Sequence, residues 1–254
     1  QNKFTDSAGN NNSESNTFSW TYDSTAPTIT GVTLASDNST ITVTFSETVW
    51  NYDVNSSGSL EVTDFVFELS GGTASLSSTT PSSISINGTE YTLGISLSGT
   101  PNGSEILTVN PALDSIYDIV GNVASTSQSN NSISLNDKLS PTMTISSSTV
   151  NSGETSNDST ISLTFTSSES TTNFIASDIT ISGGSLSSFS GSGTTYTATL
   201  TPSGDATYTI NVAQNKFTDS SGNNNSASNT FTWTYDSTSP TMTISSSTVN
   251  SGET

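Results

Sequence analysis

The chain has no cysteine and no histidine. Without cysteine, neither a disulfide framework nor a thiolate metal site can form. Without histidine, most transition-metal sites are excluded, and so is catalysis by a histidine general base. Any metal site must therefore be built from oxygen ligands.

Positive charge is also scarce, with 3 Lys and Arg against 22 Asp and Glu, which gives a formal net charge of −19. Nucleic-acid binding needs a basic footprint, so a nucleic-acid partner is not expected. An acidic surface favours solubility and cation binding. No apolar run approaches the ~20 residues of a membrane-spanning helix, so this segment is not expected to insert into a membrane.

Hydrophobic residues are few, at 29% of the chain, but they are not scattered. They alternate with Thr and Ser in short runs, as in Thr40–Phe45 and Phe231–Tyr235. A period of two indicates half-buried β-strands, which argues against a disordered chain. No segment has a convincing helical period, so an all-β fold with little helix is predicted.

Internal repetition sets the domain organisation. Residues 1–24 repeat 214–237 with three differences, and 239–254 repeat 140–155 letter for letter. The pattern Asp-x-x-x-Pro occurs at Asp23, Asp137 and Asp236, with spacings of 114 and 99 residues that suit small domains. We therefore predict the end of a preceding module (1–23), two complete modules (24–137 and 138–236) and the start of a following module (237–254). The chain is interpreted as a window in a longer tandem array.

Each complete module contains about seven alternating runs separated by Gly, Pro and Asn turns. This pattern predicts tandem immunoglobulin-like antiparallel β-sandwiches. The expected strands of the first module lie at 28–34, 40–45, 65–69, 91–97, 106–109 and 133–135, with longer loops at 50–62 and 73–83. Those of the second lie near 143–145, 161–165, 179–181, 186–189, 196–200, 208–212 and 231–235. Trp20 and Trp233 are expected in cores because of their strand pattern.

The second module resembles the bacterial immunoglobulin-like repeats of giant secreted surface adhesins. The resemblance lies in the residues FTSSES…FIASDITISGGSLSSFSGSGTTYTATLTP…TDSSGNNNSAS…WTYDSTSP. The likeness covers nearly all of the second module. The first module, with VTFSETV…VTDFVFELSGG…YDIVGN, is similar but diverged. The resemblance implies tandem sandwiches in an extracellular stalk at the cell surface, with calcium at the module junctions.

Acidic residues recur at one predicted pole of each module. In this fold the linker, the loop after the second strand and the loop before the last strand meet at the N-terminal pole. We therefore expect Asp137 to meet Glu169 and Asp219, and Asp23 to meet Glu47 and Asp118. Each set offers three carboxylates, and Ca²⁺ takes six to eight oxygen ligands at ~2.3–2.6 Å. Asp236 would serve the next junction, and acids at the opposite pole could join in (Asp37, Glu154, Asp158 and Asp205).

Other interpretations of these acids stay open. Asp-x-x-x-Pro and Asp-x-x-Gly-Asn are also ordinary turn sequences, and Glu47 and Glu169 could be solvated strand ends. Paired carboxylates can cleave glycosidic bonds, but the recurrence once per module at a junction argues against an enzyme. Trp50 and Tyr52, in the long loop of the first module, could stack on a sugar or anchor a partner, or fold back on the core.

The sequence thus predicts a non-catalytic segment of a stalk or filament in a large extracellular bacterial adhesin, made rigid by calcium. Its partners would be neighbouring modules of the same chain, and other copies if chains bundle into a fibre. The alternatives are a glycan- or surface-binding module and an accessory module of a secreted enzyme.

Overall fold

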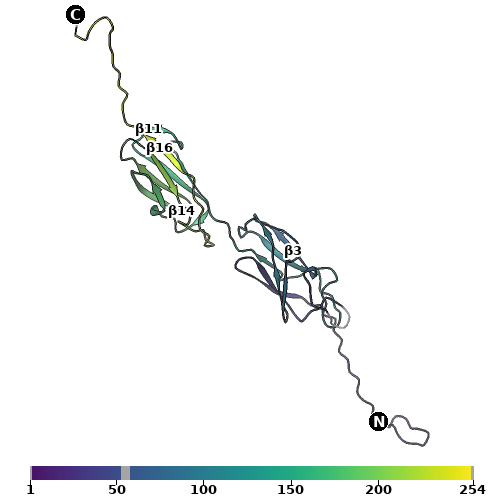
Figure 1. The fold of residues 1–254 in the computed structure, drawn as a ribbon. Coiled ribbons are helices and arrows are strands. Elements are labelled where there is room, and N and C mark those ends of the chain that lie inside the picture. The colour runs from purple at the N-terminus through teal and green to yellow at the C-terminus, as the bar shows by residue number, and fades with distance from the viewer. Residues whose placement is uncertain (1, 53–57, 253–254) are drawn as a thin grey trace. The chain divides into compact units, whose positions relative to one another are not determined.

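The computed structural model of the chain describes residues 2–52 and 58–252 (Figure 1). Its contacts divide the chain into two compact units, which are described separately. The first unit comprises 1–71, 75–98 and 106–134, and the second comprises 72–74, 99–105 and 135–254. The second unit thus includes the linker that contains Asp137, together with two short loop segments that precede it in the sequence.

The first unit is built from short antiparallel strands. Its sheets have the orders β1-β2-β6-β5, β3-β8-β9 and β4-β7. The strands are β1 (Ile29–Leu34), β2 (Thr40–Phe45), β3 (Phe65–Ser70), β4 (Ser75–Leu76), β5 (Ile84–Asn87), β6 (Glu90–Gly94), β7 (Leu97–Ser98), β8 (Ile106–Pro111) and β9 (Ser132–Ser134).

The second unit has two sheets, ordered β10-β12-β14 and β11-β16-β15-β13. Its strands are β10 (Met143–Ser147), β11 (Thr155–Ser156), β12 (Ile161–Thr171), β13 (Ile179–Ile181), β14 (Ser185–Thr201), β15 (Ala206–Val212) and β16 (Phe231–Tyr235). The described residues contain two helical elements, both three-residue 3-10 turns, η1 (Val62–Asp64) and η2 (Ala176–Asp178). The prediction of an all-β sandwich with little helix is confirmed.

Alternation places one apolar face of each sheet in the core. In the first unit Phe45, Phe65 and Tyr91 contact one another, with ring centroids 5.6–6.3 Å apart. The core of the second unit takes residues from both of its sheets, such as Leu163 of β12 and Trp233 of β16. Burial of these apolar side chains is the main stabilising contribution to each sandwich.

Three details differ from the sequence prediction. The pairing of β11 with β16 is parallel, so this sheet is mixed. Strand β12 continues to Thr171, so Glu169 lies inside a strand and not at its end. Trp20 is 72% exposed, although the equivalent Trp233 is fully buried. The core prediction for Trp20 is therefore wrong here, because no strand within the described residues packs against it.

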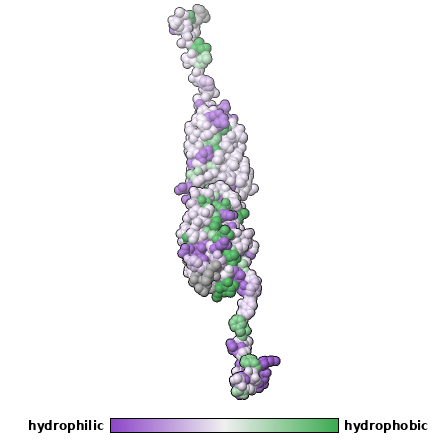
Figure 2. Space-filling view, turned by 90° about the vertical axis from the view of Figure 1, so that its right-hand side faces the viewer, coloured by the Kyte–Doolittle hydropathy of each residue, from purple (hydrophilic) through white to green (hydrophobic). Residues whose placement is uncertain are grey.

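The two units differ in the apolar residues that they expose. In Figure 2 hydrophobic residues are prominent on the lower body, the first unit, whereas the upper body is mostly pale or hydrophilic. Among the described residues of the two sandwiches, Ile175 is the large exposed apolar residue of the second. Those of the first are Tyr52, Val66, Ile86, Ile106, Leu113, Ile119, Val120 and Val123.

Candidate cation site of the second unit

Three acidic side chains from separate segments gather in the second unit. Asp137 comes from the linker, Glu169 from β12 and Asp219 from the loop between β15 and β16. One carboxylate oxygen from each lies within 4.8 Å of those of the other two. The sequence argument from the pole of the fold placed these same three residues together.

Asp219 is buried and is fixed by its own loop. Its Oδ1 accepts hydrogen bonds from the backbone N–H groups of Ser221 (2.8 Å) and Asn223 (2.9 Å), and its Oδ2 accepts one from the Asn223 side chain (2.9 Å). Gly222 has a φ of +89°, a left-handed conformation that favours glycine and lets the loop close on the carboxylate. The Asp-x-x-Gly-Asn sequence therefore encodes a local carboxylate cradle.

Asp137 is positioned by the linker and by the same loop. Its side chain accepts a hydrogen bond from the backbone N–H of Leu139 (2.9 Å), so it closes a short turn at the start of the sandwich. Its carbonyl oxygen accepts a hydrogen bond from Asn223 Nδ2 (3.3 Å). Asn223 thus joins the linker to the Asp219 loop.

The three carboxylates are electrostatically unequal. Partial burial, followed by repulsion from Asp137 and Asp219, raises the pKa of Glu169 to about 6. Burial also acts to raise the pKa of Asp219, but the hydrogen bonds from Asn223 and the loop outweigh it, and that pKa is lowered. Without a cation, protonation of Glu169 below about pH 6 would relieve part of the repulsion.

The donor set fits a hard cation. All three side chains offer carboxylate oxygens, which suit Ca²⁺ or Mg²⁺ and not the softer metals that favour thiolate or imidazole. The raised pKa of Glu169 follows from desolvation and then from the negative charges of Asp137 and Asp219, which a bound cation would offset. Asp137, Glu169 and Asp219 would supply the protein ligands, and backbone carbonyls or water the remainder.

The corresponding acids of the first unit are arranged differently. Asp118 accepts the same hydrogen bonds as Asp219, from the N–H groups of Val120 and Asn122 and from the Asn122 side chain. Asn122 also donates to the carbonyl oxygen of Asp23 (3.3 Å). Desolvation, then Asp118 and Asp23, raise the pKa of Glu47. Nevertheless, within the described residues the gathered group of three acids is that of the second unit.

The remaining predicted acids lie apart from this cluster. Asp236 is exposed and closes a turn with the N–H of Thr238 (2.9 Å), as Asp137 does with Leu139. Asp205 accepts hydrogen bonds from Ser237 and Thr238 at the start of the outgoing segment. Three other acids accept or form hydrogen bonds within their own turns: Asp37, Glu154 and Asp158.

Two kinds of residue were missed by the sequence prediction. Asn122 and Asn223 orient the site, and their repetition after Gly in the Asp-x-x-Gly-Asn pattern was a signal. Glu105 is completely buried, and its carboxylate accepts N–H hydrogen bonds from Thr73 (2.6 Å), Ala74 (2.9 Å) and Asn102 (3.1 Å). Nothing in its sequence context marks Glu105 as buried.

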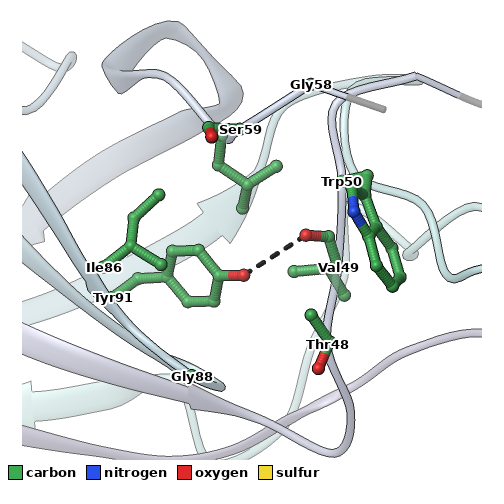
Figure 3. A pocket seen from close by; sticks show the side chains of 9 residues that line it. Thr48, Val49, Trp50, Gly58, Ser59, Ile86, Gly88 and Tyr91 are labelled. Atoms are coloured by element: carbon green, nitrogen blue, oxygen red, sulfur yellow. Dashed lines mark hydrogen bonds between the residues drawn. The ribbon is translucent and has the colours of Figure 1, made fainter. Parts of the chain in front are cut away.

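A second candidate site is a small pocket beside Trp50 in the first unit. Figure 3 shows Tyr91 and Ile86 facing Val49, with Trp50 at the edge of the group. The Tyr91 hydroxyl donates a hydrogen bond to the Val49 carbonyl (3.3 Å). Trp50 is half-buried and its backbone pairs with Tyr117, whereas Tyr52 is exposed. Residues 53–57 of the predicted long loop lie outside the described residues.

The second unit is an immunoglobulin-like β-sandwich. Its candidate cation site is formed by Asp137 of the linker with Glu169 and Asp219 of the sandwich. Residues 137–235 match the family model described as a bacterial Ig-like domain. This stretch, which contains Asp137, Glu169 and Asp219, is therefore similar to domains of that type. A comparison with curated proteins found no match.

The matched domain type bears on function at a coarse level. Bacterial Ig-like domains are surface or structural modules, generally non-catalytic and often extracellular. Across the described residues, no helix has the length and apolar character needed to span a bilayer.

Proposed function

We propose that the chain is a segment of a secreted, cell-surface stalk or filament whose task is mechanical. Tandem sandwiches would extend and present another part of the same protein. The family match to a structural domain type and the repeated sequence support this role. Neighbouring modules of the chain are its expected partners, and other copies would join if stalks bundle into a fibre.

We also propose that Ca²⁺ binds Asp137, Glu169 and Asp219. The observation that carries the proposal is that a linker residue lies within 4.8 Å of two acids of the sandwich. A cation bound there would hold the linker against the second unit. Because flexible linkers otherwise let domains move relative to each other, occupancy would restrict the hinge at Asp137.

The decisive experiment is a calcium titration of the full chain, followed by small-angle X-ray scattering and differential scanning calorimetry. We expect calcium to narrow the distribution of particle dimensions and to raise a melting temperature. Sites of this extracellular kind have dissociation constants of ~10⁻⁴–10⁻³ M, so millimolar calcium is required. NaCl at matched ionic strength controls for general screening of charge.

Two variants separate the cation site from general electrostatics. Asp137→Asn removes one ligand charge but keeps an acceptor for the Leu139 N–H, and it should abolish the calcium response. Asp178→Asn, on the same unit but outside the cluster, should leave the response intact. If neither scattering nor melting responds to calcium, the acids are turn and solubility residues and the cation proposal is wrong.

A second function is supported by the pocket beside Trp50. Aromatic rings with a neighbouring polar rim suit sugar binding, so the first unit is proposed, in second place, to bind a glycan. A glycan array with the full chain, repeated with Trp50→Ala, tests this. Binding that Trp50→Ala leaves unchanged would exclude this pocket.

A further inference from the structure

Glu105 is a completely buried acid that is not one of the three clustered carboxylates. Burial acts to raise the pKa of Glu105, but hydrogen bonds from backbone N–H groups, first among them that of Ala74, outweigh burial and lower it. The side chain is therefore a charged carboxylate at neutral pH. A buried charge is costly unless it is paired or hydrogen-bonded, so the N–H groups that surround Glu105 must be held in place.

Two short loop segments of the second unit, 72–74 and 99–105, meet at this carboxylate. Glu105 Oε1 accepts hydrogen bonds from the N–H groups of Thr73 and Ala74, and Oε2 accepts one from the N–H of Asn102 (3.1 Å). These bonds connect the two ends of the turn 102–105 to each other and to the neighbouring segment. The carboxylate thus fixes the conformation of loop 99–105.

Loop 99–105 holds the linker on both sides of Asp137. The Leu135 N–H donates a hydrogen bond to the Glu105 carbonyl (2.9 Å). The Lys138 N–H donates one to the Pro101 carbonyl (2.9 Å). Asp137 lies between these two attachments, so its position depends on the loop that Glu105 fixes.

A close approach between Gly103 and Asp137 adds to these bonds. Gly103 has a φ of +79°, a left-handed conformation that favours glycine. A Cβ built on Gly103 would lie 3.1 Å from the Cβ of Asp137, which leaves little room for any side chain there. The backbone of the loop therefore packs directly against the linker residue that belongs to the cation site.

The second unit maintains the corresponding loop with a different side chain. Residues 100–103 and 201–204 both read Thr-Pro-x-Gly. In the second of these loops the Tyr208 hydroxyl accepts a hydrogen bond from the Ser203 N–H (2.8 Å), as the Glu105 carboxylate does from the equivalent position. The loop is therefore held from the same backbone group in both places, by a phenol in one and by a carboxylate in the other.

This second loop also holds the residue that follows a linker aspartate. The Ser237 N–H donates a hydrogen bond to Asp205 Oδ1 (2.9 Å), and Ser237 follows Asp236 as Lys138 follows Asp137. The recurrence with different chemistry indicates that attachment of the linker is a property of the loop and not an accident of one contact.

We propose that Glu105 is a positioning residue for the candidate cation site: through loop 99–105 it holds the linker where Asp137 joins the other two acids. Glu105 is not itself a ligand, since its carboxylate faces backbone N–H groups. The inference rests on the proposed calcium site. If the linker is released, Asp137 reaches the site in only a fraction of molecules, and the apparent dissociation constant rises by the inverse of that fraction.

Glu105→Gln in the full chain tests this role. Because two N–H groups converge on Oε1, the amide oxygen takes that place, and the amide nitrogen then faces the Asn102 N–H, donor against donor. A calcium titration followed by amide NMR reports folding through the dispersion of the spectrum and binding through the resonances of residues 219–223. We expect the calcium dissociation constant to rise about fivefold, as when the linker is in place in about a fifth of the molecules.

Asp64→Asn is the matched control. Asp64 is also buried, and its carboxylate accepts a hydrogen bond from the Glu61 N–H (2.7 Å) in the first unit. This variant should lose stability without a change in the calcium dissociation constant. An unchanged dissociation constant in folded Glu105→Gln, or an equal rise in Asp64→Asn, would overturn the proposal.

A second pair of variants leaves the buried carboxylate intact. Gly103→Ala places a Cβ against Asp137 and should also raise the dissociation constant. Gly88→Ala is its control, because Gly88 has a φ of +63° but open space around its Cβ. Both variants carry backbone strain, so only a difference between them in calcium affinity supports the role of the loop, and equal affinities contradict it.

Amide hydrogen exchange separates this inference from the calcium proposal. Without calcium, Glu105→Gln should speed the exchange of the Lys138 N–H several-fold, and Asp64→Asn should not. If the wild-type chain binds no calcium, the cation proposal fails, and this rate alone decides whether Glu105 holds the linker. If calcium binds, it should slow exchange at Asn102 in return, since coupling is reciprocal. An unchanged Lys138 rate in Glu105→Gln contradicts the proposal in either case.

Discussion

The two units carry the same pattern of acidic residues, but among the described residues three carboxylates lie close together in the second unit and not in the first. In both, an Asp in the loop before the last strand accepts a hydrogen bond from the Asn four residues later, and that Asn also donates to the carbonyl of the linker Asp. The difference lies in the glutamate. Glu169 sits inside β12, whereas Glu47 lies two residues beyond the end of β2.

The position of the glutamate relative to its strand accompanies this difference. Glu169 lies within β12, where the pairing with β14 shifts register between Thr166 and Thr171, and its carboxylate lies near those of Asp137 and Asp219. Beyond the end of β2 the backbone bends at Glu47, and among the described residues Glu47 is not part of a gathered group of three acids. A shared motif is thus not enough to define a shared site.

The largest expected effect on stability comes from the loop aspartate, Asp219 or Asp118, which accepts the same hydrogen bonds in both units. Asp219→Ala removes three hydrogen bonds to a buried carboxylate and should destabilise the second unit by about 3 kcal/mol without calcium. The loss should be larger with calcium, because a proposed ligand is removed as well. Asp118→Ala should do the same to the first unit. Urea denaturation measures both.

Asp6→Ala is the matched control, since it breaks the same kind of loop in the repeated segment 1–24 and should leave both sandwiches unchanged. If Asp219→Ala costs far less in stability than Asp118→Ala, the loops are not equivalent.

Calcium should act on the two units unequally. At 100 times the dissociation constant, a ligand specific for the folded state adds about 2.7 kcal/mol of stability. This gain is expected for the second unit, and a smaller one for the first, whose acids are not gathered. Calorimetry with assigned transitions distinguishes them. Equal gains in both units would show that Glu47 moves into place when a cation binds.

Acid should stabilise the second unit when calcium is absent. Because the pKa of Glu169 is raised from 4.5 to about 6 in the fold, its protonation favours the folded state. This contribution is fully present below about pH 4.5 and is lost as the pH rises through 6. Allowing for solvent screening, its size is about 1 kcal/mol.

Chemical denaturation with a chelator at pH 5 and pH 7.5 measures this slope. Glu169→Gln should flatten it, and calcium should do the same by replacing the proton. A slope that survives Glu169→Gln must come from other carboxyl groups.

Glu47→Gln should have the smallest effect. The pKa of Glu47 is raised by desolvation and by Asp118 and Asp23, so the sign of its contribution matches that of Glu169. Since Glu47 lies at a bend, the expected change in the stability of the first unit is a few tenths of a kcal/mol. An effect as large as that of Glu169→Gln would indicate that its acids are closer in solution.

Much of the fold could be predicted because alternation is a direct record of burial. The runs ending at Phe45, Phe165 and Trp233 place every second side chain in a core, and the structure confirms those strands. The parallel β11–β16 pair could not be predicted, since β11 has two residues and no apolar pattern. Trp20 shows the limit of pattern alone, because burial also needs neighbouring strands.

The topology of the fold predicts which loops of the site lie near one another, but not how their side chains are oriented. Knowing which loops share a pole brought Asp137, Glu169 and Asp219 together. Whether three side chains converge depends on local strand length, which the motif does not contain. The buried Glu105 was missed for a related reason, because the N–H groups of Thr73 and Ala74 that it accepts from belong to a loop about 30 residues earlier in the sequence.

The parallel pairing of β11 with β16 has a mechanical consequence. Three backbone hydrogen bonds connect the segments that contain these two strands. The Gly153 N–H donates to the Thr232 carbonyl, the Thr234 N–H to the Glu154 carbonyl, and the Asp236 N–H to the Ser156 carbonyl. Tension that pulls one strand toward the start of the chain and the other toward its end loads these bonds side by side. They must then rupture together by sliding, whereas a hairpin pulled from its open end unzips one bond at a time. If the segment is pulled from its two ends, the hydrogen bonds between β11 and β16 would resist its extension.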